Sequence, residues 1–370
     1  ERTIRVGFVS DDFRFHAVYF FFHDTFTGRP RERWRGTLYA NQTVVDNCTR
    51  TFMEAADIFR DVSAMDDKTL ARQIRDDGID ILIDLDGHTK GNRLPVFALR
   101  PAPVQATFLD YVDTSGLDAM DFIIADENLI PPELEKYYTE EVIRLAGDAL
   151  CYSPPDYETP LSEPPAVKNG YITFGCFNTA HKISTETVAL WSRVLDRVER
   201  SRLLLNVPIY RNQVVRERYL GLFEGNGIAR QRVEFRQGTS HELFLGQYRD
   251  VDIALDTTPY SSGLNTCEAL WMGVPVIALA GERQSARLAT SHVLAAGFPE
   301  YAAKDKDDFI AKATTLAADI PALNERRQGQ RHKVAASALC DRGRYTEHFT
   351  EALRTIWRKA CAKQEKGGTQ

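Results

Sequence analysis

The chain has 370 residues, enough for two domains that each bury a core of their own. With 43% hydrophobic and 26% charged residues, its composition is that of a globular protein and excludes a disordered or collagen-like chain. The formal net charge of -6 provides no basic field for a phosphate backbone, so we expect no nucleic-acid partner.

Several features predict a cytoplasmic protein without a membrane segment. The apolar runs, such as residues 19–22 and 274–280, are far shorter than the roughly 20 residues of a membrane helix. No signal peptide opens the sequence, and because it begins with Glu1 rather than methionine we expect a fragment of a longer chain. The six cysteines form no C-x-x-C pair and have no histidine at metal-ligand spacing, which indicates reduced thiols and predicts that no metal is bound.

Short apolar runs alternate with amphipathic stretches along the chain, a pattern typical of βαβ units in a parallel sheet. In a first domain, residues 1–155, the pattern predicts strands near 4–9, 36–39, 79–85, 104–108 and 122–125, and helices near 67–77 and 92–99. The first of these helices is amphipathic and ends at Gly78, as a helix with a glycine C-terminus does.

A proline-rich segment separates the two halves. Residues 151–169 hold five of the 16 prolines, which predicts a linker over 156–170 with neither helix nor central strand. The alternation then restarts in a second domain, residues 171–340, with strands near 172–176, 202–207, 233–235, 252–255 and 274–279, and helices near 184–198, 212–223, 240–248, 265–272 and 285–296. The fold class expected is therefore α/β, with two Rossmann-like doubly wound domains.

The C-terminal residues predict one more helix. Residues 341–362 are amphipathic, with Phe349, Leu353 and Trp357 on one side, and we expect this helix to pack back across the linker. The polar residues 363–370 predict a disordered tail.

Ligands of doubly wound domains bind at the carboxyl ends of the strands, so the loops there hold the candidate site. After the strand near 252–255, small hydroxyl residues and a glycine precede a helix, a geometry that aims backbone N–H groups and the positive helix end at a phosphate. The residues expected to cradle a diphosphate are Ser261, Ser262, Gly263, Asn265 and Thr266. Glu268, one turn into the helix, could accept hydrogen bonds from ribose hydroxyls. The alternative is an ordinary helix capped by Ser262 or Asn265.

Other strand ends carry further candidates, each with an ordinary structural alternative. Lys182 is placed to neutralise a phosphate oxygen, or it is a solvated surface lysine. Phe244 could stack on a nucleobase, or it belongs to the core. His16 could act as a general base because the pKa of histidine lies near working pH, or it caps a helix. His88 and Thr89 lie in a second polar loop of the first domain.

These loops together resemble a known family. The sequence motifs are RVGFVSDDFRFH at residues 5–16, DDGIDILIDLDGHTKGNR at 76–93 and FALRPAPVQATFL at 97–109, followed by matching blocks at 114–116, 120–126, 174–182 and 251–275. In this order they resemble the catalytic region of the protein O-GlcNAc transferase family, glycosyltransferase family 41, including its bacterial and SPINDLY-like members.

The resemblance implies a two-lobed glycosyltransferase fold, named GT-B, and an inverting, metal-independent transfer of a sugar from a nucleotide diphosphate to Ser or Thr hydroxyls of proteins. UDP-GlcNAc is the donor most expected, although glucose and fucose donors also occur among relatives, and no cofactor is implied. His16 matches a histidine discussed as catalytic base or acceptor-site residue, and Lys182 matches the lysine that stabilises the leaving diphosphate. The first domain then becomes the acceptor side, with His88 and Thr89. Tetratricopeptide repeats usually precede this region, but this sequence contains no 34-residue repeat.

The nucleotide-sugar site that the resemblance implies comprises Thr179, Phe244, Gln247, Ser261, Ser262, Gly263, Leu264, Asn265, Thr266 and Glu268. Several of these depart from the family pattern. Leu264 lies where bacterial relatives have a threonine-rich run, Thr179 where an amide is common, Phe244 where a histidine stacks on uracil, and Gln247 where some members have an arginine. The base and the sugar therefore stay open, and so do two alternative functions, a non-catalytic nucleotide-sugar-binding scaffold and a UDP-sugar 2-epimerase of the same fold.

Overall fold

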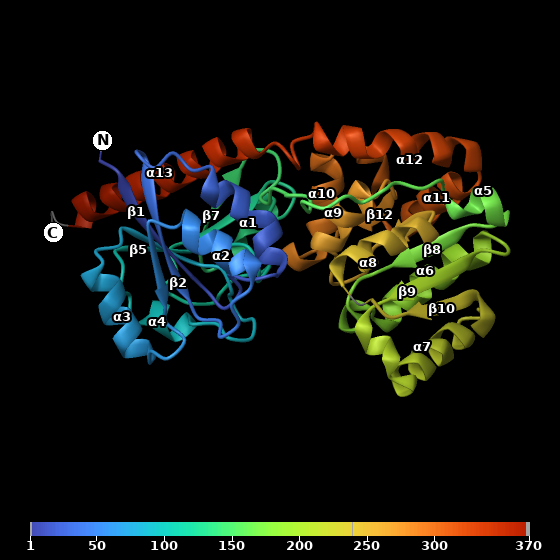
Figure 1. Ribbon diagram of the computed structural model, residues 1–370, viewed down its shortest axis with the longest axis horizontal. Coiled ribbons are helices and arrows are strands. Elements are labelled where there is room, and N and C mark those ends of the chain that lie inside the picture. The colour runs from blue at the N-terminus through green and yellow to red at the C-terminus, as the bar shows by residue number, and fades with distance from the viewer. Residues whose placement is uncertain (1, 239, 368–370) are drawn as a thin grey trace. The chain divides into compact units, whose positions relative to one another are not determined.

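The computed structural model describes residues 2–238 and 240–367. The chain divides into two α/β units (Figure 1). Unit 1 comprises Glu1–Ser153 together with Asp341–Gln370, and unit 2 comprises Pro154–Cys340. Across the described ranges, no helix has the length and apolar character that crossing a membrane requires.

In the described part of unit 1, seven parallel strands form one sheet in the order β3-β2-β1-β4-β5-β6-β7. Their bounds are β1 (Ile4–Ser10), β2 (Trp34–Ala40), β3 (Ile58–Asp61), β4 (Ile81–Asp84), β5 (Val104–Thr107), β6 (Phe122–Asp126) and β7 (Glu141–Leu145). Phe8 of β1 pairs with Leu38 on one side and Ile83 on the other. The strand order reverses between β1 and β4, so the loops after these two strands lie where doubly wound sheets usually bind ligands.

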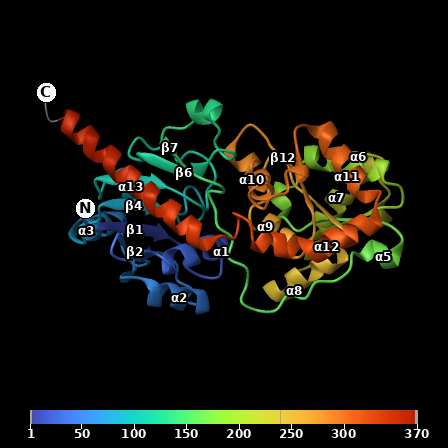
Figure 2. The ribbon, with the colours of Figure 1, turned by 90° about the horizontal axis from the view of Figure 1, so that it is seen from above.

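The helices of unit 1 include one from the far end of the chain. The helices are α1 (Ala17–Thr27), α2 (Asn47–Ala55), α3 (Asp67–Asp76), α4 (Leu94–Ala98), the 3₁₀ helix η1 (Pro132–Tyr137) and α13 (Arg342–Gly367). Figure 2 shows α13 running along unit 1, where it contacts α1, β5 and β7. Its Phe349 packs against Phe22 and Trp34, and the Trp34 indole donates a hydrogen bond of 3.0 Å to the Thr350 hydroxyl.

In the described part of unit 2, six parallel strands form a sheet in the order β10-β9-β8-β11-β12-β13. The strands are β8 (Thr173–Cys176), β9 (Arg202–Asn206), β10 (Val233–Arg236), β11 (Ile253–Leu255), β12 (Val276–Leu279) and β13 (Ala302–Ala303). The α-helices are α5 (Pro165–Asn169), α6 (Thr185–Arg197), α7 (Gln213–Gly225), α8 (His241–Gly246), α9 (Leu264–Trp271), α10 (Leu288–Ala295), α11 (Lys306–Ala317) and α12 (Ile320–Ala335). The 3₁₀ helices are η2 (Ala180–Lys182), η3 (Pro208–Arg211), η4 (Arg230–Arg232), η5 (Gln247–Asp250), η6 (Gln284–Ala286) and η7 (Pro299–Tyr301). The order of this sheet reverses between β8 and β11.

Two predictions for segments outside the two predicted domains need correction. The proline-rich segment, predicted to lack helix, contains α5, because Pro165 at the first helical position loses no hydrogen bond and has the φ that a helix needs. The helix then ends at Gly170, which adopts φ 68°. At the C-terminus α13 continues to Gly367 instead of giving way to a disordered tail after residue 362, while residues 368–370 of that predicted tail lie outside the described residues.

Candidate functional site

The loop between β11 and α9 is built around a buried carboxylate. Asp256 directly follows β11 and is 4% exposed. It accepts hydrogen bonds from the Ser261 hydroxyl at 2.7 Å and from the Ser262 backbone N–H at 2.8 Å. Burial raises the pKa of Asp256 to about 6, against the lowering effect of these donors. The Ser261 hydroxyl also accepts from the Ala289 N–H of α10 at 2.9 Å, so this residue of the predicted cradle anchors the loop from inside.

The loop presents the N-terminus of α9 without a side-chain cap. Gly263 occupies the N-cap position, and among the described residues no side chain accepts a hydrogen bond there. Asn265, one of the two caps that the alternative reading proposes, donates instead to the Phe177 carbonyl at 2.6 Å, and the Ser262 carbonyl accepts from the Thr266 hydroxyl at 3.3 Å. An uncapped helix start offers N–H groups and the positive end of the helix dipole, which suits an anion.

Lys182 is brought to this same loop from the carboxyl end of β8. It is the last residue of η2, and its side chain is half-buried. The Lys182 ammonium donates to the Ser261 carbonyl at 3.2 Å and lies 3.8 Å from the centre of the Tyr260 ring. A second tie joins the loops, since the Asn178 amide donates to the Thr257 hydroxyl at 2.7 Å. The reversal in strand order thus gathers a cation and an uncapped helix start at one place.

Glu268 is the one acid of the predicted nucleotide-sugar site, and it is only 1% exposed. One carboxylate oxygen, Oε1, lies 2.6 Å from Nε2 of His241, the first residue of α8. The other ring nitrogen of His241, Nδ1, lies 2.5 Å from the Tyr157 hydroxyl. Glu268 Oε2 is also buried, and it has no hydrogen-bond partner among the described residues. Burial raises the pKa of Glu268, which the hydrogen bond from His241 opposes.

The remaining residues predicted for this site lie on or next to η2, α8 and α9. Phe244 is half-buried and meets Phe177 edge to face, with ring centres 5.2 Å apart, so its ring already contacts protein aromatic groups. Gln247 follows α8 and is half-buried, Leu264 begins α9 and is half-buried, and Thr179 is exposed just before η2. Thr179 follows β8, Phe244 and Gln247 precede β11, and Leu264 follows β11. That these four side chains contact a ligand stays a prediction.

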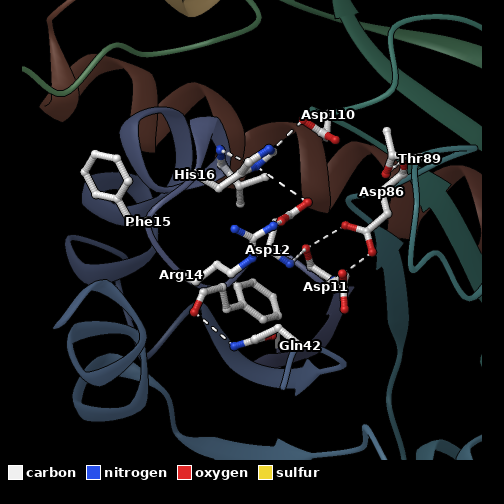
Figure 3. Close-up of polar contacts among 12 residues, drawn as sticks. Asp11, Asp12, Arg14, Phe15, His16, Gln42, Asp86, Thr89 and Asp110 are labelled. Atoms are coloured by element: carbon white, nitrogen blue, oxygen red, sulfur yellow. Dashed lines mark hydrogen bonds and ion pairs between the residues drawn. The ribbon is translucent and has the colours of Figure 1, made fainter. Parts of the chain in front are cut away.

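In unit 1, His16 lies at the start of α1 in the loop after β1 (Figure 3). It is the N-cap residue, as its structural alternative predicts, with Nδ1 accepting from the Val18 N–H at 3.5 Å. The same nitrogen lies 3.5 Å from a carboxylate oxygen of Asp12 and 3.9 Å from one of Asp110, which follows β5. These three side chains offer ligand atoms within 4.8 Å of one another, close enough to surround a cation.

Two buried carboxylates hold the loop after β1 against the loop after β4. Asp86 accepts from the Ser10 hydroxyl at 2.6 Å and from the Asp11 N–H at 2.7 Å (Figure 3). Burial and the nearby charge of Asp84 raise the pKa of Asp86, and burial raises the pKa of Asp84 to about 6. The loop after β4 continues into the two residues predicted on the acceptor side.

Those two residues, His88 and Thr89, are fixed by backbone carbonyl groups. His88 is exposed, and its Nε2 lies 2.8 Å from the Ser115 carbonyl. The Thr89 hydroxyl donates to the Asp86 carbonyl at 2.8 Å. Both residues follow β4 and His16 follows β1, so all three lie at the point where the strand order of this sheet reverses.

A comparison with known protein families shows to which family the chain belongs. The model of glycosyl transferase family 41 matches residues 1–149 and 165–349. The chain belongs to this family. The resemblance stated from the sequence motifs is thereby confirmed, and both parallel-sheet units lie within the match.

The chain is also similar to individual curated proteins and to solved structures. It is 33% identical over 367 residues to a protein of Petunia hybrida named probable UDP-N-acetylglucosamine–peptide N-acetylglucosaminyltransferase SPINDLY, which covers 98% of this chain and 39% of that protein. A solved variant of the O-GlcNAc transferase of Thermobaculum terrenum matches with a TM-score of 0.94 and 34% identity, covering 98% of this chain and 69% of the other. HepE from Anabaena, solved with UDP and glucose, has the same fold at a TM-score of 0.57 and 12% identity. The predicted GT-B fold is confirmed, and the chain spans about two fifths of the length of the curated relatives it matches.

Proposed function

We propose that this family 41 chain transfers N-acetylglucosamine from UDP-GlcNAc to Ser or Thr hydroxyls of a protein, with inversion at the anomeric carbon and without a metal or other cofactor. The observation that carries the proposal is the position of Lys182 beside the uncapped start of α9. The names of the relatives, which are peptide N-acetylglucosaminyltransferases, support the choice of sugar and acceptor.

Negative charge develops on the leaving diphosphate as the sugar is transferred. The acceptor oxygen forms a bond to the anomeric carbon, and the bond from that carbon to the diphosphate oxygen breaks, so UDP leaves with the electron pair. The negative charge that grows on the leaving phosphate is stabilised by the Lys182 ammonium and by the N–H groups that begin α9. We propose that this protein cation takes the place that a metal ion has in metal-dependent enzymes.

A base must also take the proton of the attacking hydroxyl, and we assign this role to His16. Its side chain is about one third exposed, which leaves the imidazole accessible. Asp12 and Asp110 lie on its Nδ1 side, where a carboxylate stabilises the imidazolium that forms when His16 accepts the proton. His88 and Thr89 are proposed to contact the acceptor from the neighbouring loop.

One experiment separates this function from its two alternatives. UDP release from UDP-GlcNAc is measured with and without a Ser/Thr-containing protein acceptor, and binding of UDP and GDP is measured by calorimetry. A transferase releases UDP in proportion to added acceptor and yields a glycosylated protein visible by mass spectrometry. An epimerase converts the donor without acceptor, and a scaffold binds nucleotide without turnover, so either result would overturn the proposal.

A further inference from the structure

Asp86 is a fully buried carboxylate that follows β4, and both of its oxygens accept hydrogen bonds from the end of β1 and the loop after it. Oδ1 accepts from the Ser10 hydroxyl at 2.6 Å and Oδ2 from the Asp11 N–H at 2.7 Å (Figure 3). These donors oppose the rise in the pKa of Asp86 that burial and the charge of Asp84 cause. The carboxylate thus holds the segment that leads to His16.

The Ser10 hydroxyl carries this contact one step further. Its oxygen accepts from the backbone N–H of Asp12 at 2.9 Å, while its single hydrogen is donated to Asp86. A serine that bonds the N–H two residues ahead of it fixes a local turn of the backbone. Ser10 is fully buried, so Asp86 fixes the orientation of a hydroxyl that in turn fixes the backbone of Asp12.

The Asp12 side chain reaches the proposed base. One of its oxygens lies 3.5 Å from Nδ1 of His16, and the other accepts from the Arg14 guanidinium at 2.5 Å. Asp12 is only 4% exposed, so its position is set by these contacts and by the bond from its N–H to Ser10. A continuous set of contacts therefore runs from Asp86 through Ser10 and Asp12 to His16.

The backbone of Asp86 holds a second loop, independently of its side chain. Its carbonyl accepts from the Thr89 hydroxyl at 2.8 Å and from the Thr89 N–H at 3.1 Å. Every substitution at position 86 keeps this carbonyl. The effect of the side chain on the loop of His16 can therefore be measured apart from the anchoring of Thr89.

We propose that Asp86 is a positioning residue for His16: by orienting the Ser10 hydroxyl it fixes Asp12 at the distance from which Asp12 orients the imidazole toward the attacking hydroxyl. The inference rests on the proposed function, in which His16 is the base. It adds to that function a buried residue that does not itself contact the imidazole or a substrate.

Asp86→Asn is the most direct test, because asparagine has nearly the same shape but only one acceptor oxygen, so its NH₂ group meets one of the two donors. Turnover is measured as UDP release from UDP-GlcNAc at saturating protein acceptor. We expect kcat to fall by about 10- to 100-fold, as a displaced catalytic group causes. The KM for the acceptor should change less than threefold, because Thr89 is held by the backbone, and the calorimetric affinity for UDP should stay within twofold.

Asp80→Asn is the matched control. Asp80 is also a buried carboxylate of unit 1 that accepts a backbone N–H, that of Arg5 at 2.8 Å, but it lies at the opposite end of β4 from Asp86. Its kcat should stay within twofold of the wild type. A fall in kcat of the same size in both variants would assign the effect to lost stability and overturn the inference.

The contribution of His16 is isolated by combining variants. In a His16→Ala background, Asp86→Asn should change kcat by less than twofold, because it has no base left to position, whereas effects that multiply would refute the inference alone. A His16→Ala variant with wild-type turnover would refute the proposed base and the inference together. Ser10→Ala should lower kcat in the same range as Asp86→Asn, which keeps the test open if the Asp86→Asn chain does not fold; wild-type turnover in Ser10→Ala would also overturn the inference.

A measurement without substrate tests the structural link itself. Amide hydrogen exchange at Asp11 and Asp12 is followed by NMR in the wild type, Asp86→Asn and Asp80→Asn. Because these two N–H groups are held by Asp86 and Ser10, we expect their exchange to be about tenfold or more faster in Asp86→Asn and unchanged in Asp80→Asn. Wild-type exchange at both amides in Asp86→Asn would overturn the inference whatever the turnover.

Discussion

Replacing Lys182 by methionine tests the proposed leaving-group stabilisation most directly. Methionine keeps an unbranched side chain of similar length against the Tyr260 ring but removes the charge that reaches the Ser261 carbonyl. A unit charge 4 Å from the ammonium, in a half-buried site with an effective dielectric constant of about 20, interacts with it by about 4 kcal/mol. Only the charge that grows in the transition state counts toward the rate, so we expect kcat to fall by about 10²- to 10³-fold.

The assay for this variant is UDP release at saturating UDP-GlcNAc and saturating protein acceptor. The KM for the donor should change less than kcat, because the ground-state diphosphate is also held by the start of α9. Lys168→Met is the control, since this lysine lies in the last turn of α5 and is exposed. A Lys182→Met variant whose turnover is within threefold of the wild type would refute the reasoning.

Three more predictions address the base, the metal and the buried acids. His16→Ala should lower kcat by at least about 10²-fold and leave the calorimetric affinity for UDP within twofold; a collapse of that affinity would make His16 a donor-site residue. Prolonged dialysis against EDTA should leave turnover within twofold, and a loss that Mg²⁺ or Mn²⁺ restores would contradict the metal-independent mechanism. Burial raises the pKa of Asp84, Asp252 and Asp256 to about 6 each, so these groups bind protons on folding between about pH 4 and 6, and their contribution to stability falls as pH rises through that window. The free energy of unfolding is measured in urea at pH 4.5 and at pH 7 for the wild type and for Asp252→Asn. Between these two pH values it should fall by about 1–3 kcal/mol less in Asp252→Asn than in the wild type. Equal falls in the two proteins would contradict the assignment.

Most strands and helices could be predicted because their apolar pattern is local. The helix predicted near 184–198 is α6, Thr185–Arg197, and the strand predicted near 202–207 is β9, Arg202–Asn206. Helix α12 was not predicted, because it has no apolar stripe to reveal it. One of its buried residues is Arg327, whose guanidinium donates to the Val251 and Tyr248 carbonyls at 2.6 and 2.7 Å. A polar helix held by such bonds leaves no periodic hydrophobic signal in the sequence.

Some residues of the candidate site could be predicted from the sequence and others could not. Lys182 and the loop before α9 could be found from sequence because a cation and small residues directly follow strands. The partners of Glu268 could not, because Tyr157 lies in a segment whose prolines indicate only a linker, and His241 meets Glu268 through tertiary packing across 27 positions. The carboxylates around His16 are likewise contributed by different strand ends, after β1 and β5.

The return of α13 to unit 1 has a consequence for how the protein is made. A ribosome releases β1 to β7 before unit 2, but the helix that covers the aromatic surface around Trp34 emerges only after all of unit 2 has been synthesised. The hydrogen bond between Trp34 and Thr350 joins residues 316 positions apart, so it cannot form until residue 350 has been synthesised. During that interval unit 2 can complete its own sheet, while unit 1 waits with part of its core open to water and to chaperones. Unit 1 is thus closed by a segment that is translated only after the whole of unit 2.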